Sequence, residues 1–287
     1  SIILKRTMKN AQQLLAQIGL EQIEENIYRG KSHSIGSRRV FGGQVLAQAL
    51  QAATLTVPTE RLAHSMHCYF ILPGDVNKPI IYDVDRIRDG GSFTTRRVVA
   101  IQNGSAIFNM SASFQIQEEG FEHQINMPNV PPPEALQYAT ELMRNNLKKL
   151  PEYLQKSLDL PRPIEFRPVE MPHFVNPSKG RPFRHIWIRV KGEVENQAAI
   201  HRTLLAYASD YNLLETALRP HGTTWTEIIA ASIDHAMWFH RNFKMDEWLL
   251  YALDSPSASN ARGFTRGNIF DRDGKLVASV VQEGLIR

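Results

Sequence analysis

The sequence predicts an α+β protein in which a helix packed against a curled antiparallel sheet occurs twice along the chain. Two kinds of local pattern indicate this: amphipathic helical spacing, and short segments rich in β-branched and aromatic residues that end at turn signals. The third indication is a repeat, because His64 and Gly104 are 40 residues apart and Asp234 and Gly274 are also 40 residues apart. Such self-similarity is typical of a duplicated unit.

The first half begins with two predicted helices. The apolar residues of the first helix, spaced as on one face of an amphipathic helix, are Ala11, Leu14, Leu15 and Ile18. The second helix is expected over 41–53, where leucines and alanines recur at the same spacing. The Gly42-Gly43 pair at its start would let the backbone pack closely against a neighbour.

Four strands are expected after these helices, over 64–72, 78–90, 92–102 and 105–117. Glycines in the intervening segments mark the turns, and Asn103-Gly104 is typical of a tight hairpin. One helix followed by a run of antiparallel strands is an α+β plan.

A proline-rich stretch separates the two halves. Residues 128–182 hold 11 of the 16 prolines, and a helix is expected within them over 134–150. This composition indicates a connector laid over the surface. We therefore expect an N-terminal unit at 1–120, a connector with a short helix at 121–160, and a C-terminal unit at 161–287.

The second half repeats the plan of the first. A strand is expected over 184–192 and a helix over 196–218. Further strands should follow over 227–240, 247–259, 261–271 and 275–286, with Asp273-Gly274 closing a hairpin as Asn103-Gly104 does.

Composition and charge exclude several classes of protein. The net charge is +4 and no block of Lys or Arg stands out, so nucleic acid is not an expected partner. No apolar run approaches the about 20 residues of a membrane helix, so membrane insertion is not expected. The single cysteine, Cys68, cannot form an internal disulfide, which suits the cytoplasm.

Two polar residues interrupt apolar patterns. Asp210 follows Tyr207 by three residues and Thr203 by seven, close to the apolar stripe of its predicted helix. A poorly solvated carboxylate there is a candidate general base with a raised pKa, although it could also cap the next helical turn. Gln282 extends an alternating apolar face; an amide there invites a specific hydrogen-bond partner, although a glutamine at a strand end more often faces water.

The stretch "ASIDHAMWFH" offers three interpretations of a site. Asp234 and His235 form a conspicuous pair, His235 and His240 could bind a metal, and Ser232 could use its hydroxyl or simply fill space. Zinc needs three or four ligands, and two histidines five residues apart on a strand face opposite ways, so no metal is expected. By the same alternation Ser232 and Asp234 should share one face, while Asp234 and His235 should not.

Several segments resemble the bacterial acyl-CoA thioesterase II family of the TesB type. The likeness runs in order from about residue 10 to the last residue, and its segments include "VFGGQVLAQAL", "HSMHCYFILPGD", "YASDYNLL", "IDHAMWFHR" and "VVQEG". The resemblance implies a double hot-dog fold, in which two fused units each wrap a sheet around a helix. It also implies hydrolysis of acyl-CoA to fatty acid and coenzyme A without metal or cofactor, by a homodimer or homotetramer.

The resemblance also implies the catalytic residues. They would be Asp210, Ser232 and Gln282, acting together on a water molecule; close bacterial relatives have Thr at the position of Ser232, so the hydroxyl is kept. Asp234 and His235 would then be structural hydrogen bonders that support the site. Two alternatives remain open, namely a hot-dog enoyl-CoA hydratase or dehydratase and a non-catalytic acyl-CoA-binding module.

A set of strand arginines has two interpretations. They could meet the phosphates of coenzyme A, or they could simply be solvated; these residues are Arg86, Arg88, Arg96, Arg97, Arg262 and Arg266.

Overall fold

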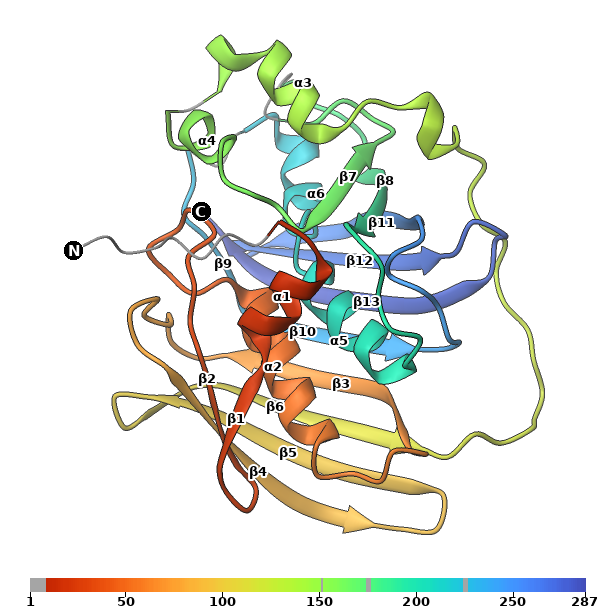
Figure 1. The fold of residues 1–287 in the computed structure, drawn as a ribbon. Coiled ribbons are helices and arrows are strands. Elements are labelled where there is room, and N and C mark those ends of the chain that lie inside the picture. Colours follow the sequence, from red (N-terminus) through yellow and green to blue (C-terminus); the bar gives the residue numbers. More distant parts are fainter. Residues whose placement is uncertain (1–8, 151, 174–176, 224–226) are drawn as a thin grey trace.

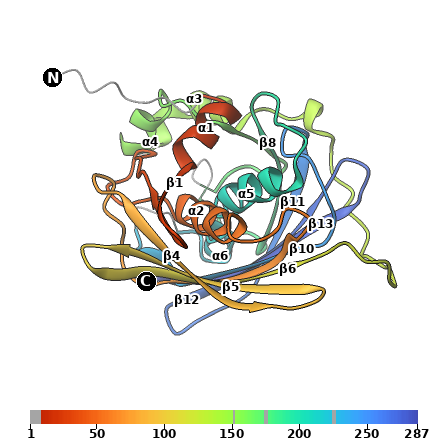
Figure 2. The same ribbon diagram turned by 60° about the horizontal axis from the view of Figure 1, so that its bottom comes forward.

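The computed structural model describes residues 9–150, 152–173, 177–223 and 227–287. A single antiparallel sheet of 13 strands is formed by these residues, and it curls around two central helices, α2 (Gly42–Thr54) and α5 (Ala198–Ser209) (Figures 1 and 2). A shorter helix, α1 (Ala11–Ile18), packs beside α2 with Ala11, Leu14 and Ile18 buried. The α+β plan expected from the sequence is therefore confirmed.

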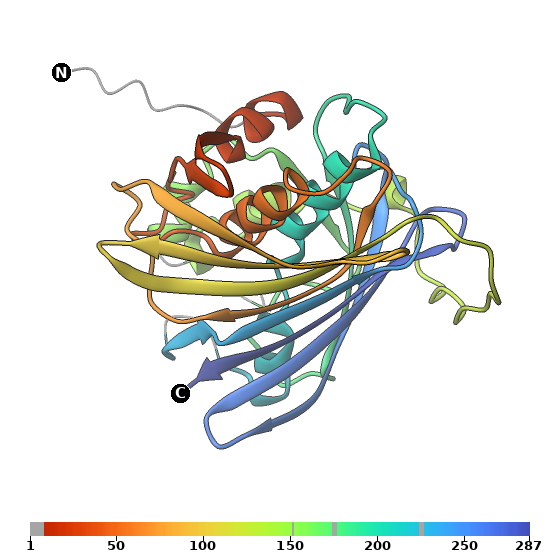
Figure 3. The same cartoon turned by 90° about the horizontal axis from the view of Figure 1, so that it is seen from below.

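The strand order is the same in the two halves when it is read outward from the middle of the sheet. The first half contributes β3 (Leu62–Phe70), β6 (Ser105–Gln115), β5 (Phe93–Gln102), β4 (Ile80–Asp89), β2 (Ile27–Gly30) and β1 (Leu20–Glu24). The second half contributes β10 (Asp234–Phe239), β13 (Leu276–Ile286), β12 (Arg262–Phe270), β11 (Leu249–Ser259), β8 (Phe183–Val190) and β7 (Ile164–Pro168), and β9 (Ala230–Ser232) pairs with β13. The antiparallel pair β3 and β10, with Met66 opposite Met237, joins the halves into one curved layer (Figure 3).

The two central helices approach each other closely because of a glycine. A Cβ atom on Gly43 would lie 2.2 Å from the carbonyl oxygen of Tyr207, which is far inside van der Waals contact. Small residues such as Ala47 and Ala49 are also fully buried on α2. The helices are consequently apolar on most sides, as helices enclosed by a sheet must be. The close packing expected at Gly42-Gly43 is confirmed.

Three sequence predictions about element boundaries are wrong. The helix expected over 134–150 is divided into η1 (Pro133–Ala135), α3 (Ala139–Asn145) and η2 (Leu147–Lys149), with α4 (Glu152–Ser157) following. The helix expected over 196–218 ends at Ser209, because Asn212 has a left-handed backbone with φ 67°, and α6 (Glu215–Leu218) and η3 (Arg219–His221) form beyond it.

The third wrong boundary is the single strand expected over 227–240. It is interrupted between β9 and β10 at Ile233. There Oδ1 of Asp234 accepts a hydrogen bond from the backbone N–H of Glu283 at 2.7 Å. In a continuous pair of strands, a backbone carbonyl would accept that hydrogen bond instead. Strands β1, β2 and β7 were not expected at all. No helix among the described residues is long and apolar enough to cross a membrane.

Candidate active site

Asp210 lies where the end of α5 meets the beginning of α2. It is the C-cap residue of α5, and its carboxylate accepts the backbone N–H of Gly43 in the first turn of α2. The N-cap residue of α2, Phe41, makes no side-chain cap, so a carboxylate from the other half of the chain takes that place. A Cβ atom on Gly42 would lie 2.5 Å from Oδ2 of Asp210, so the glycine makes room for the carboxylate.

The surroundings of Asp210 raise its pKa to about 6, mainly because burial disfavours the charged form. The hydrogen bond from Gly43 acts in the opposite direction but does not compensate. The Oδ1 atom is buried and has no hydrogen-bond partner among the described residues. A carboxylate with one oxygen held and the other short of a partner can accept a proton from a water molecule placed beside it.

Gln282 and Ser232 are joined by a hydrogen bond. The Nε2 atom of Gln282, on β13, donates to Oγ of Ser232 at 3.1 Å, and Ser232 is the last residue of β9. The Gln282 side chain is buried, with 1% of the residue exposed, whereas Ser232 is half-buried. Of the two interpretations of this glutamine, the structure shows the one with a specific hydrogen-bond partner.

One cavity of about 350 Å³ brings the three candidates together, because Asp210, Ser232 and Gln282 all line it. Part of its wall is apolar and comes from α3, β7, β8 and the segment before α6, with Met143, Phe166, Ile186 and Leu214 among the lining residues. Nothing in the sequence alone places residues 210, 232 and 282 at one cavity; the resemblance named them, and their side chains share this wall.

A buried ion pair also lines the cavity, and the sequence interpretation missed it. Arg184 on β8 and Glu215 at the start of α6 are 2.7 Å apart, with side chains 2% and 9% exposed. A signal was present, because Arg184 shares the inward phase of its strand with Ile186 and Ile188, where a charged residue is unexpected.

His235 lies directly behind Gln282. Its Nδ1 atom is 2.7 Å from Oε1 of Gln282, and its Nε2 atom is 3.0 Å from Oγ of Ser209. Burial lowers the pKa of His235 to about 4, so the ring is neutral near pH 7. The residue thus supports the site through hydrogen bonds.

The interruption at Ile233 changes which residues share a face. His235 and Ser232 both contact Gln282, so both face the interior, although an unbroken strand would place them on opposite faces. Asp234 alternates with His235 along β10 and binds the backbone of Glu283. The expectation that Ser232 and Asp234 share one face is therefore wrong. The interruption of the strand at Ile233, between β9 and β10, is the physical reason.

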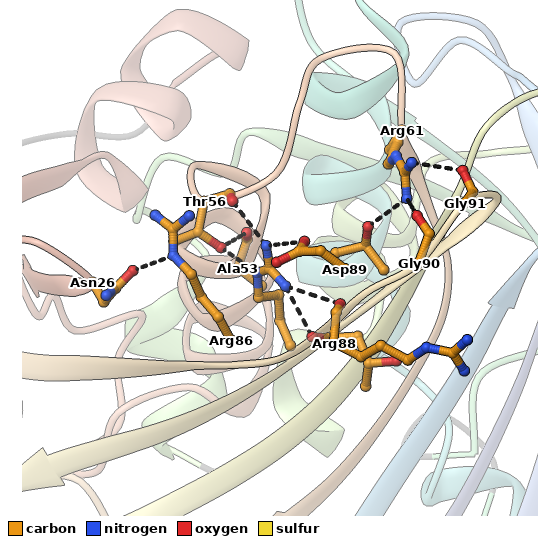
Figure 4. Close-up of polar contacts among 12 residues, drawn as sticks. Asn26, Ala53, Thr56, Arg61, Arg86, Arg88, Asp89, Gly90 and Gly91 are labelled. Carbon is orange, nitrogen blue, oxygen red and sulfur yellow. Dashed lines mark hydrogen bonds and ion pairs between the residues drawn. The ribbon is translucent and has the colours of Figure 1, made fainter.

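The strand arginines have partners of their own. Arg96 is 1% exposed and lies at the end of α2, where its Nε atom donates to Oγ1 of Thr56 at 2.8 Å and its Nη2 atom binds Asp89 at 2.7 Å. Its partners Thr56 and Asp89 are labelled in Figure 4. Neither interpretation, solvated or phosphate-binding, is right for Arg96, because the sheet and helix enclose it. The exposed arginines form pairs on the surface, namely Arg97 with Asp85, Arg262 with Glu283 and Arg266 with Asp254, while Arg86 binds Asn26.

The part of the chain that the structure describes contains no group of three or more His, Cys, Asp or Glu residues that could hold a metal ion. His235 and His240 do not share a site: His235 is enclosed in the interior, and His240 follows the end of β10 and is exposed.

Comparison with known proteins identifies the family. Residues 160–285 match the family described as acyl-CoA thioesterase, and residues 29–115 match the family described as acyl-CoA thioesterase N-terminal domain. The chain is 42% identical to acyl-CoA thioesterase 2 of Haemophilus influenzae over 276 residues, which covers 96% of both chains. It is 40% identical to acyl-coenzyme A thioesterase 8 of Mus musculus, covering 94% of this chain and 87% of the mouse protein. The chain therefore belongs to the acyl-CoA thioesterase family.

Solved structures agree with this assignment. The acyl-CoA thioesterase II TesB2 of Mycobacterium marinum superposes with a TM-score of 0.79 at 39% identity, covering 96% of this chain and 98% of the other. A protein of unknown function with a hot-dog fold from Alicyclobacillus acidocaldarius superposes with a TM-score of 0.76 at 16% identity, which bears on the fold alone. The fold is a double hot-dog, as the resemblance implied.

Proposed function

We propose that the protein hydrolyses acyl-CoA thioesters to a free fatty acid and coenzyme A. The observation that carries the proposal is the meeting of Asp210, Ser232 and Gln282 at one partly apolar cavity in a chain of this family. Thioester hydrolysis needs an activated water, groups that position it, and hydrogen-bond donors near the carbonyl oxygen. The three side chains can supply the first two of these.

Each residue has a distinct role in the proposed reaction. Asp210 takes a proton from the water molecule while the water oxygen attacks the thioester carbonyl carbon. A pKa of about 6 leaves this carboxylate ionised near pH 7 and makes it a stronger base than an ordinary carboxylate. Since Gln282 donates to Oγ of Ser232, the Ser232 hydroxyl proton is free to point at the water or the substrate. When the carbon–sulfur bond breaks, the thiolate of coenzyme A takes the proton back from Asp210.

The state of His235 argues against the hydratase alternative. A hot-dog hydratase would need a histidine to move a proton at the α-carbon of its substrate. His235 is fully buried, neutral, and bonded on both ring nitrogens to Gln282 and Ser209. It therefore has no free nitrogen with which to perform that step.

The decisive experiment is a thiol-release assay over a series of saturated acyl-CoA substrates of increasing chain length. We expect multiple turnovers with release of one thiol per fatty acid. A hydratase cannot turn over a saturated acyl-CoA, and a binding module would not exceed one turnover. Absence of multiple-turnover thiol release across the series would overturn the proposal in favour of one of these alternatives.

The proposal extends to the organisation of the chain. Units at 1–120 and 161–287, joined by the segment 121–160, are supported by the equal strand order of the two halves and by the two separate family matches.

Strands β1 and β7 end the strand order, and sheet edges of this kind favour pairing, which supports a homodimer or homotetramer. The proposed location is the cytoplasm, in keeping with the buried and unpaired Cys68. Light scattering after gel filtration would test the oligomeric state.

A further inference from the structure

His235 is held from two sides by groups that belong to the proposed site. On one side it contacts the amide of Gln282, and on the other it contacts Ser209, the residue directly before Asp210. The backbone carbonyl of Ser209 also accepts the hydroxyl of Tyr251 at 2.9 Å, which anchors this end of α5 to β11. His235 is thus the link between the helix end that carries Asp210 and the strand that carries Gln282.

The hydrogen bonds fix which nitrogen of His235 carries the proton. The amide of Gln282 donates through Nε2 to Ser232, so its Oε1 atom must accept, and the donor facing it is Nδ1–H of His235. A neutral imidazole has only one N–H, so Nε2 must accept. Its donor is the hydroxyl of Ser209, whose one proton then points to Nε2 at 3.0 Å in place of the carbonyl oxygen of Ala206, which is 2.9 Å from the same Oγ atom. The polar chain therefore runs in one direction, from Ser209 through His235 and Gln282 to Ser232.

An amide without such a partner can rotate by 180° with little change in shape. The rotated Gln282 would present its carbonyl oxygen to Ser232, and the serine proton would then be drawn toward the glutamine and away from the cavity. The Nδ1–H group opposes this rotation, because a rotated amide would set two donors against each other in a buried place, where neither has another partner.

We propose that His235 is a positioning residue, whose Nδ1–H group selects the amide orientation in which Gln282 donates to Ser232 and whose Nε2 contact with Ser209 keeps that amide in register with Asp210. The inference rests on the proposed role of Gln282 in hydrolysis. It differs from a packing role, because packing requires only the volume of the ring and not the proton on one particular nitrogen.

Two substitutions at this position separate the two nitrogens. In His235→Asn the amide nitrogen can occupy the place of Nδ1 and still donate to Gln282, whereas in His235→Gln it can reach the place of Nε2 and contact Ser209 instead. We expect kcat of His235→Asn to remain within several-fold of the parent. The kcat of His235→Gln should fall by about tenfold or more with KM within about threefold, because a hydrogen bond that orients an active group is lost.

The measurement is steady-state thiol release at matched folded fraction, with melting temperatures recorded for both variants. Both should be less stable than the parent, so stability alone does not distinguish them. If the two variants have the same kcat, whether parental or equally reduced, His235 acts by packing and the inference is wrong. Gln282→Ala is measured in parallel: undiminished kcat in that variant would remove the role of Gln282 itself, a different failure from that of His235.

A second measurement does not depend on the activity of any variant. In protein labelled with ¹⁵N at its 10 histidines, the His235 signals should show a protonated Nδ1 and an unprotonated Nε2 near pH 7. The signals are assigned by their loss in either folded variant, because burial lowers the pKa of both His235 and His33 to about 4 and resistance to titration would not separate the two. A proton on Nε2 would overturn the inference.

Discussion

The two central helices end in different surroundings, although the strands around them have the same order. At the end of α5, Asp210 faces a cavity with one carboxylate oxygen short of a partner. At the end of α2, the guanidinium of Arg96 fills the corresponding space, binding both Oγ1 and the carbonyl oxygen of Thr56, at 2.8 and 3.1 Å. One end is closed by satisfied hydrogen bonds, and the other opens onto the cavity of the proposed site.

Equivalent strand positions explain the difference. Counted from the central pair Met66 and Met237, Arg96 opposite Ala112 in the first half corresponds to Gly267 opposite Val280 in the second. By the same count, Gln282 opposite Thr265 corresponds to Phe114 opposite Thr94. A long cation in the first half thus stands where the second half has glycine, and an apolar ring stands where the second half has the amide of Gln282. If the proposed reaction is right, the same scaffold serves stability at one helix end and chemistry at the other, and a few side chains decide which.

The largest expected effect comes from removing the charge at the open end. Asp210→Asn should keep the fold and the binding of acyl-CoA, while kcat falls by about 10²–10⁴, the range typical of a lost general base. Steady-state thiol release measures the fall. A kcat within threefold of the parent would show that the open end of α5 is no more catalytic than the closed end of α2.

The pH dependence of the same residue sharpens the contrast. Activity needs the charged form, so kcat should decrease as the pH falls through about 6, by about tenfold per unit below that value. Stability changes in the opposite sense: a carboxyl whose folded pKa exceeds its unfolded value of 3.8 stabilises the fold below that value, and this stability is lost as the pH rises through about 6. Asp210→Asn should therefore have a higher melting temperature than the parent at pH 7.5. The residual kcat of this variant should no longer decrease as the pH falls through about 6. An acid limb that persists in the asparagine variant would assign it to another group.

At the closed end the expected loss is one of stability. Arg96→Met keeps the volume of the stem but leaves several buried oxygens without a donor, so the free energy of unfolding should fall by about 2–4 kcal/mol. Arg97→Met is the matched control, because the neighbouring Arg97 makes only an exposed pair with Asp85 and should change stability by less than about 1 kcal/mol. Denaturant titration compares them. If Arg96→Met lowers kcat at matched folded fraction, the division between a stabilising end and a catalytic end is wrong.

The smallest expected effects concern the hydroxyl of Ser232. Ser232→Ala should lower kcat by about tenfold, since a hydrogen bond to an activated group is worth about 1.5–3 kcal/mol. Ser232→Thr keeps the oxygen and suits a strand, so it should remain within several-fold of the parent. Thiol release on both variants tests whether the oxygen or only the volume matters, and equal activity of the alanine and threonine variants would leave Ser232 as a filler.

Much of the fold was predictable from local patterns. The strands over 64–72, 78–90, 92–102 and 105–117 appear as β3 to β6, because alternation and turn residues depend on near neighbours in the chain. The element boundaries that were predicted wrongly depend on the backbone at a turn or on contacts with distant parts of the chain. The expected helix over 196–218 ends at Ser209 because the chain reverses at Asn212, and 227–240 is interrupted where the Asp234 side chain replaces a backbone partner.

The candidate site was predictable in its members but not in its connections. Asp210 and Gln282 stand out because each is a polar residue that continues an apolar pattern, and the family resemblance supplied Ser232. The contacts of Gln282 with His235 and Ser232 span 47 and 50 residues of sequence, and periodicity carries no information at that range. Strand alternation even separated Ser232 from His235, which the structure places against the same amide.

The sequence by itself determined the two-part α+β plan, the hairpins at Asn103-Gly104 and Asp273-Gly274, and the polar residues within apolar faces, because these follow from spacing along one segment. Only the tertiary structure decided that Asp210 caps the beginning of α2, that Arg96 closes the end of the same helix, and that a buried ion pair lines the cavity. Those outcomes depend on which distant groups are brought into the low-dielectric interior and which partners they find there. Burial of a charge is costly unless the fold supplies its partner, and no single segment contains that information.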